Sequence, residues 1–270
     1  MAAELTDKLA VVTGGALGIG GGVTRALHAA GATVVVNDLD VNALHALRDE
    51  LGQRVQLVPG DIHYPSTVTA LRQSVSELAP AADVLVNNVG DYRPWSKSFL
   101  DSSEEQWQQL YAINLEHVFR VTHALLPGMT EAGRGSIVNV STVEAFRGIP
   151  SNAVYSAFNA GVSAFTKSLA VEVAASGIRV NAIAPDLADT PQTPAESMLR
   201  GRDPEMVRSW VPLGRFGQPD DYAQVVLFLA GDASRFVTGH TIPVDGGTLA
   251  ASGWYRRADG RGFTNLPDRP

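Results

Sequence analysis

Residues 13–20 read Thr-Gly-Gly-Ala-Leu-Gly-Ile-Gly and lie between an apolar run and a segment with helical spacing. Glycines at the start of a helix let backbone N–H groups approach a phosphate at the positive end of the helix dipole. The next apolar run ends at Asp38, where a carboxylate can accept hydrogen bonds from a ribose. A glycine loop alone can be an ordinary tight turn. The order of strand, loop, helix, strand and acid nevertheless predicts a dinucleotide site.

The charge around this loop favours a cofactor with a free ribose 2′-hydroxyl. A carboxylate at Asp38 would repel a 2′-phosphate, and Leu17 places no cation in the loop to pair with one. We therefore expect NAD rather than NADP. An alternative for Asp38 is the N-cap of the following helix, a position for which Asp40 competes.

A parallel sheet is needed to position these residues, and the pattern along the chain predicts one. Short runs rich in Val, Ile and Leu alternate with longer helical patterns, as in parallel sheets with right-handed crossovers. The predicted strands are residues 8–13, 32–37, 54–58, 83–87, 135–141, 178–183 and 240–244. The predicted helices are residues 18–30, 40–51, 65–79, 103–127, 152–175 and 219–231. The expected fold class is α/β, a single-domain Rossmann-type doubly wound parallel sheet of seven strands with helices on both faces.

Residues 1–250 are expected to form this domain, including a long connection at residues 186–218. That connection is rich in proline and leaves the carboxyl end of a strand, where open α/β sheets bind ligands. We therefore predict a substrate lid. Residues 251–270 are expected to be an extended tail that either wraps a neighbouring subunit or is loose.

Composition excludes several classes of protein. The 270 residues include 21 basic and 28 acidic side chains, so the net charge of −7 gives no field to attract nucleic acid or an anionic membrane surface. The absence of cysteine excludes disulfides and thiolate metal sites, and we expect no metal. The longest apolar runs fall far below the roughly 20 residues that span a bilayer. We expect a cytoplasmic protein with neither nucleic acid nor membrane as a partner.

Further motifs follow the glycine loop in order. They are Asn-Asn-Val-Gly at residues 87–90, Asn114 in a helical segment, Ile-Val-Asn-Val-Ser-Thr at residues 137–142, Tyr155, Pro185 with Thr190, and Val-Asp-Gly-Gly at residues 244–247. With this order and spacing, the chain resembles the short-chain dehydrogenase/reductase family from Leu9 to Gly247. The resemblance implies a nicotinamide dinucleotide cofactor.

The same resemblance implies where that cofactor is held. Asp61 corresponds to the acid that caps the adenine ring, and Asn114 to the asparagine that holds a water in the proton relay. The implied cofactor contacts are Gly14, Leu17, Gly18, Ile19, Gly20, Asp38, Asp61, Ile62, Asn88, Gly90, Tyr155, Asn159, Pro185 and Thr190.

Catalysis in the family depends on a tyrosine that acts as general acid and base and on a hydroxyl that fixes the substrate oxygen. Tyr155 corresponds to the tyrosine. The family spacing places the hydroxyl thirteen residues earlier, at Thr142 rather than Ser141. Because neighbouring residues of a strand face opposite ways, only one of the two can point at the substrate, and we expect Thr142.

The chain departs from the family at the lysine that normally follows the tyrosine by four residues, because Asn159 stands there. The next cation, Lys167, lies twelve residues beyond Tyr155, about 18 Å along a helix, and cannot replace it. Without a cation, the pKa of Tyr155 is expected near its ordinary value of about 10. Carbonyl reduction, which needs a neutral tyrosine, and alcohol oxidation at raised pH are then the easier reactions.

Side chains that could line a substrate pocket are aromatic, methionine, acidic and arginine residues: Tyr92, Arg93, Trp95, Glu144, Phe146, Arg147, Met198 and Trp210. They suit a bulky or ring-bearing substrate, and an arginine could meet a carboxylate or a CoA phosphate. Asp186 is a second departure, since relatives usually have glycine after that proline.

The predicted function is an NAD-dependent oxidoreductase that interconverts a secondary alcohol and a ketone with Tyr155 as acid and base. Apolar residues on more than one face of the helices at residues 103–127 and 152–175 favour a homotetramer, because relatives pair these helices across a two-fold axis. Two alternatives remain: a catalytically impaired nucleotide-binding relative, and a non-redox lyase or dehalogenase on the same scaffold. The retained Gly14 and Asp38 argue against the last of these.

Overall fold

The computed structural model describes residues 4–251, 255–257, 259–261 and 263–264. Its central feature is a parallel sheet in the order β3-β2-β1-β4-β5-β6-β7. The strands are β1 (Leu9–Thr13), β2 (Thr33–Asp38), β3 (Val55–Pro59), β4 (Val84–Asn87), β5 (Gly135–Val140), β6 (Ile178–Pro185) and β7 (Thr241–Val244). Each predicted strand is present, and the doubly wound α/β fold is confirmed.

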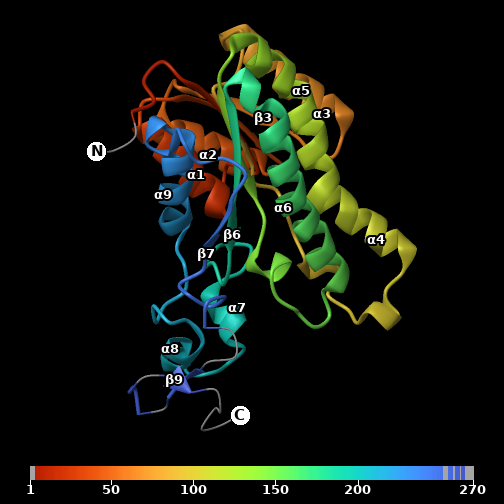
Figure 1. The fold of residues 1–270 in the computed structure, drawn as a ribbon, viewed down its shortest axis with the longest axis vertical. Helices are drawn as coiled ribbons and strands as arrows, with labels where there is room; N and C mark the ends of the chain where they lie inside the picture. Colours follow the sequence, from red (N-terminus) through yellow and green to blue (C-terminus); the bar gives the residue numbers. More distant parts are fainter. Residues whose placement is uncertain (1–3, 252–254, 258, 262, 265–270) are drawn as a thin grey trace.

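Helices cover both faces of the sheet (Figure 1). One face carries α1 (Gly18–Ala29), α2 (Val41–Leu51) and α9 (Pro219–Ala230). The other carries α3 (Pro65–Leu78), α5 (His117–Ala132) and α6 (Ala153–Val173). Alternate residues of the central strand enter the two cores, with Val12 in one and Val11 in the other. Burial on both faces explains why these strands are nearly continuous apolar runs.

The sheet positions the site through its change of direction at β1. The chain moves outward from β1 to β2 and β3, then returns to add β4 on the other side of β1. Such a switch point opens a crevice at the carboxyl ends of the two central strands. Asn88, just after β4, bridges this crevice by donating from Nδ2 to the carbonyl oxygens of Thr13 (3.1 Å) and Gly14 (3.0 Å).

The helix predicted at residues 103–127 is interrupted and longer than expected. It consists of α4 (Glu104–Tyr111), a π-helical turn at Ala112–Glu116 and α5, which ends at Ala132 before the left-handed Gly133. This π-helical turn contains Asn114. Its Oδ1 accepts a hydrogen bond from the N–H of Asp91, and its Nδ2 donates to the carbonyl oxygen of Asp91. Periodicity could not reveal this, because a single inserted residue changes the hydrogen-bond register without changing the apolar pattern.

The predicted lid contains short helices rather than loop alone, among them α7 (Ala195–Leu199) and α8 (Val207–Trp210). Val207, Val211 and Phe216 give it a small apolar core of its own. Figure 1 shows this region beyond the carboxyl ends of the strands.

The tail is not simply extended where the structure describes it. Strands β8 (Tyr255–Arg256) and β9 (Phe263–Thr264) pair antiparallel, and β8 packs on α8. Arg256 donates from Nη2 to the carbonyl oxygen of Pro212 at 2.6 Å, so this hairpin is tied to the lid. The predicted contact of the tail with a second subunit stays untested, and parts of residues 251–270 lie outside the described residues. Among the helices of the described ranges, none is long and apolar enough to cross a membrane.

Candidate active site

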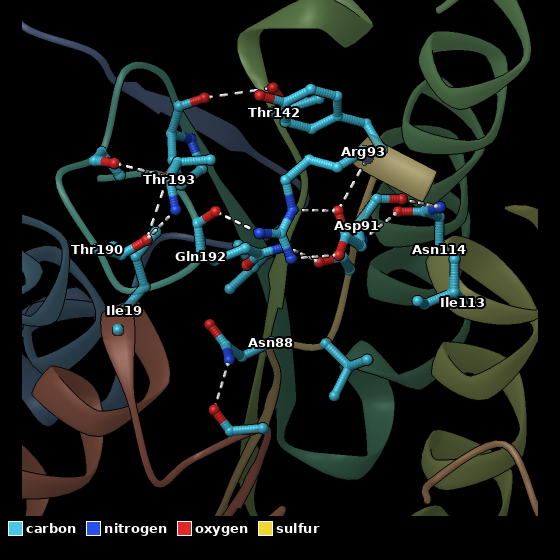
Figure 2. A pocket seen from close by; sticks show the side chains of 18 of the residues that line it. Ile19, Asn88, Asp91, Arg93, Ile113, Asn114, Thr142, Thr190, Gln192 and Thr193 are labelled. Carbon is cyan, nitrogen blue, oxygen red and sulfur yellow. Dashed lines mark hydrogen bonds and ion pairs between the residues drawn. The ribbon is translucent and has the colours of Figure 1, made fainter. Parts of the chain in front are cut away.

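A cavity of about 900 Å³ opens at the carboxyl ends of the strands, between the glycine loop and the lid. Figure 2 shows its side chains, which come from α1, from the loops after β4 and β5, and from the lid. Almost all the predicted site residues line it: Gly14, Leu17, Gly18, Ile19, Asp38, Asp61, Ile62, Asn88, Gly90, Asn114, Thr142, Tyr155, Asn159, Pro185 and Thr190.

The glycine loop is shaped as a cradle. Gly14 and Gly18 have φ angles of +59° and +54°, which side-chain-bearing residues rarely adopt. Leu17 precedes α1 without a side-chain cap, so the first N–H groups of the helix lack a side-chain acceptor. Gly20 is not among the residues that line the cavity, and a Cβ there would lie 2.0 Å from the carbonyl oxygen of Gly14, so its cofactor contact stays a prediction. Gly20 lets the helix pack against the loop.

Asp38 is held beside the glycine loop. Its carboxylate accepts hydrogen bonds from the N–H groups of Ala16 and Asp40, both at 3.0 Å. The N-cap of α2 is Asp40, which accepts from the N–H of Ala43 at 2.9 Å. The alternative of Asp38 as the helix cap is therefore wrong, and Asp38 is one of the residues that line the cavity.

At the far end of the cavity, Asp61 is paired with a residue that sequence reasoning missed. The Asp61 carboxylate contacts Nδ1 of His63 at 2.5 Å and accepts from its backbone N–H at 2.9 Å. The His63 ring meets the ring of His117 edge-on, with centroids 5.9 Å apart. Only the fold brings these two histidines together, because 54 residues separate them.

Thr142 and Ser141 point in different directions at the end of β5. The Ser141 hydroxyl donates to the carbonyl oxygen of Asn159 at 3.0 Å and lies 3.3 Å from Oγ of Ser163, so it is directed at α6. The Thr142 hydroxyl donates to the carbonyl oxygen of Pro185 at 3.3 Å, and Thr142 and Tyr155 both line the cavity. Geometry therefore favours Thr142 as the hydroxyl of the site.

Tyr155 lies in the first turn of α6 with its ring against Tyr92, centroids 5.7 Å apart. Burial raises the pKa of its hydroxyl above the ordinary value, and the carboxylates of Glu144 and Asp91 act in the same direction. The neighbouring Thr142 hydroxyl lowers the pKa only in part. The expectation of an unshifted pKa is therefore wrong, because the sequence could not reveal how deeply the ring is buried.

Asn159 occupies the cavity wall one turn after Tyr155 and is almost fully buried. Its Nδ2 donates to the carbonyl oxygen of Tyr155 at 3.1 Å. The amide is therefore hydrogen-bonded to the backbone of its own helix, and it brings no positive charge to the tyrosine.

The lid is tied to the loop after β4 by three residues, shown at the centre of Figure 2. Arg93 donates to the carboxylate of Asp91 from Nε (3.0 Å) and from Nη2 (2.7 Å). Its Nη1 donates to the carbonyl oxygen of Gln192 at 2.5 Å. Gln192 returns a hydrogen bond to the carbonyl oxygen of Gly90 at 3.0 Å. Asp91 and Gln192 were missed from the sequence, although both stand within two residues of predicted site positions.

Of the predicted substrate-pocket residues, Tyr92, Arg93, Glu144 and Met198 line the cavity, whereas Trp95, Phe146, Arg147 and Trp210 do not. Trp210 packs in the core of the lid. Arg147 forms ion pairs with Glu144 at 2.9 Å and with Asp186 at 2.8 Å. An arginine expected to meet an anionic substrate is thus occupied by two carboxylates of the protein. Within the described ranges, no group of three or more His, Asp or Glu side chains could hold a metal ion.

Comparison with known proteins agrees with this geometry. The family described as Enoyl-(Acyl carrier protein) reductase matches residues 14–248. The chain is 39% identical over 254 residues to a 3-oxoacyl-[acyl-carrier-protein] reductase of Thermotoga maritima, covering 91% of this chain and 99% of that one. It is 38% identical over 248 residues to an acetoacetyl-CoA reductase of Rhizobium meliloti, covering 91% and 100%.

Solved structures give the same result. A short chain dehydrogenase/reductase family protein superposes with a TM-score of 0.82 at 36% identity, covering 92% of this chain and 99% of that chain. A putative betaketoacyl-ACP reductase superposes with a TM-score of 0.81, also at 36% identity, covering 92% and 100%. The glycine cradle, the paired Thr142 and Tyr155 hydroxyls and these matches together show that the chain belongs to the short-chain dehydrogenase/reductase family.

Proposed function

We propose that this protein is an NAD-dependent oxidoreductase that interconverts a ketone and a secondary alcohol. The observation that carries the proposal is one cavity that brings Thr142 and Tyr155 together with the glycine cradle. Two hydroxyls at one point can hold and protonate a carbonyl oxygen. The names of two relatives, a 3-oxoacyl reductase and an acetoacetyl-CoA reductase, support a ketone as substrate.

The residues fit a nicotinamide dinucleotide with a free ribose 2′-hydroxyl. Gly14 and Gly18 leave room for a pyrophosphate beside the uncapped N-terminus of α1. Asp38 offers a fixed carboxylate to a ribose, and none of the residues that line the cavity near it is a lysine or arginine that could pair with a 2′-phosphate. These features support NAD over NADP and weigh against a lyase or dehalogenase.

In the reductive direction, the Tyr155 hydroxyl gives its proton to the carbonyl oxygen of the substrate. Thr142 donates a hydrogen bond to the same oxygen and fixes its position. The cofactor supplies the hydride when bound. Because the raised pKa keeps Tyr155 protonated at neutral pH, its hydroxyl is available as the proton donor when a ketone is reduced. Oxidation needs the tyrosinate, which is scarce without a neighbouring cation.

Apolar side chains around the reaction end support a bulky or ring-bearing substrate. Tyr92 stacks obliquely on Tyr155, and Met198 reaches the same cavity from the lid. The hydrogen bond from Arg93 to Gln192 ties the lid to the loop after β4, so we infer that the lid must loosen for exchange of ligands.

A screen of ketones and secondary alcohols with NADH and NAD, followed at 340 nm, tests the proposal. Turnover of any ketone supports it and removes the catalytically impaired alternative. Tight cofactor binding with no turnover across the panel would instead favour a nucleotide-binding relative. That alternative draws support from Asn159, which supplies no charge to activate the tyrosine.

A further inference from the structure

One guanidinium group is shared by two buried carboxylates at the reaction end of the cavity. Nη2 of Arg147 lies 2.9 Å from Glu144 and 2.8 Å from Asp186. The side chains of the two acids are only 12% and 8% exposed. One positive charge cannot compensate two negative charges, so this network leaves about one negative charge in a poorly solvated place.

Neither carboxylate is free to turn away. Asp186 also accepts from the N–H of Leu187 at 2.9 Å and from the hydroxyl of Thr248. Glu144 lies two residues after Thr142, in the short turn Val143–Ala145, and is held by two nitrogens of Arg147.

Both acids belong to the cavity wall beside the reacting groups, because Glu144 follows Thr142 by two residues and Asp186 follows Pro185, whose carbonyl oxygen accepts from Thr142. The field of Glu144 reaches the Tyr155 hydroxyl. Two other arginines line the cavity: Arg93, which is bound to Asp91, and Arg200 of the lid. Residues lining the cavity carry five carboxylates against two guanidinium groups.

We propose that Glu144 and Asp186 determine substrate specificity by excluding a negative charge next to the reacting carbonyl. This inference rests on the proposed function and adds the substrate class to it: ketones flanked by ester, thioester, amide or hydroxyl groups are accepted, and the corresponding free keto acids are rejected. Like charges a few ångströms apart in a low-dielectric cavity change affinity by about tenfold or more. A distant charge, such as a phosphate at the far end of a long thioester, is not excluded by this mechanism.

Matched pairs of a keto ester and its acid test the inference. Methyl benzoylformate and benzoylformate share a ring and a ketone and differ by one charge, as do ethyl acetoacetate and acetoacetate. We expect kcat/KM to be at least about tenfold higher for the ester in the parent protein. Glu144→Gln should reduce that ester-to-acid ratio by about tenfold, and Asp186→Asn should change it in the same direction.

A charge-matched control is available on the surface. Glu50 pairs with Arg25 at 2.6 Å, both side chains are more than 40% exposed, and neither lines the cavity. Glu50→Gln removes the same charge and should leave the ester-to-acid ratio as it is in the parent. A ratio that falls equally in Glu50→Gln would show a general effect of net charge and overturn the inference.

Binding separates this inference from the proposed function. Dissociation constants of each ester and acid for the NADH-loaded protein, from calorimetric titration, need no turnover. Tighter binding of the ester in the parent, with the difference reduced in Glu144→Gln, supports the inference even where no ketone is reduced. Equal binding of ester and acid, or a ratio unchanged in both cavity variants, contradicts it while leaving ketone reduction possible. Absence of turnover across all pairs contradicts the proposed function instead.

Discussion

The Asn159 side chain donates a hydrogen bond to the carbonyl oxygen of Tyr155, 3.1 Å away and one turn earlier in α6. The family places a lysine at this position. In this chain the side chain is an amide that is hydrogen-bonded to the backbone of its own helix. The consequence is a tyrosine buried among carboxylates and without a cation, whose pKa is raised above the ordinary value. A neutral Tyr155 is suited to the reductive direction of the reaction that we propose.

Substitution Asn159→Lys should restore oxidation at neutral pH. A cation within a few ångströms lowers an acidic pKa by roughly 1–3 units, so the tyrosinate becomes about ten to a thousand times more abundant. In the parent, the oxidation rate should keep rising with pH beyond about 10, since the folded-state pKa lies above that reference value. The measurement is the pH–rate profile of alcohol oxidation with saturating NAD.

The matched control for this variant is Ser168→Lys, which adds the same charge at an exposed position of α6. Its profile should coincide with that of the parent. A parent profile that already reaches a plateau near pH 7 would contradict the assignment of the proton to Tyr155.

Cofactor preference should depend on Asp38. We expect NADH to bind at least about tenfold tighter than NADPH, a difference of about 1.4 kcal/mol, because the fixed carboxylate repels a 2′-phosphate. Asp38→Ser should remove most of this difference. Fluorescence titration of both nucleotides measures it, with Asp40→Asn as the control, since Asp40 caps α2 and does not line the cavity. Equal affinities in the parent would rule out the ribose role of Asp38.

Much of the fold and of the cofactor cradle could be predicted because both depend on local pattern. Strands buried on both faces are apolar runs, and glycines, Asp38 and Asn88 follow those runs directly. Boundaries fell within two residues for most elements; β6 extends to Pro185, two residues past the prediction, because it continues to pair with β7. Thr142 could be chosen over Ser141 because the family places the hydroxyl thirteen residues before the tyrosine, and alternation along a strand lets only one of the two point at the substrate.

The remaining features depend on contacts between residues far apart in the chain. Arg147 and Asp186 are 39 residues apart, and Arg93 and Gln192 are 99 apart. No spacing rule predicts that such pairs meet. The raised pKa of Tyr155 likewise follows from burial that only the assembled cavity produces.

Acid should destabilise the protein through His117. This ring is fully buried, neither nitrogen has a hydrogen-bond partner of normal geometry, and the carbonyls of Ile113 and Val89 lie near it. Burial, with the nearby His63, lowers its pKa to about 3. The unfolded chain binds a proton below pH 6.5 that the folded chain cannot, so stability present above that pH is lost as pH falls. The expected loss between pH 7 and pH 5 is about 2 kcal/mol.

Urea unfolding at the two pH values, at one protein concentration, measures this loss. His117→Leu should flatten the pH dependence by about 2 kcal/mol, because the titrating group is removed. His123→Leu, at an exposed position of the same helix, should leave it unchanged. An equally steep dependence in His117→Leu would show that other groups carry the effect.

Assembly into a homotetramer is expected from apolar side chains on the outer helices. Val171 on α6 is 81% exposed and Phe236 after α9 is fully exposed in the single chain. Light scattering at micromolar concentration should return about four times the mass of one chain, or at least twice that mass. A monomer under these conditions would contradict the prediction.

The role of Tyr155 as proton donor is measured by the rate of NADH consumption at 340 nm with the best ketone of the screen, for the parent and for Tyr155→Phe. Removal of the single hydroxyl should lower kcat by at least about a hundredfold, because it removes the phenol that we propose as the proton donor beside Thr142 in the cavity. NADH affinity should stay within about threefold of the parent. Retained turnover in Tyr155→Phe would show that another group delivers the proton and would contradict the account.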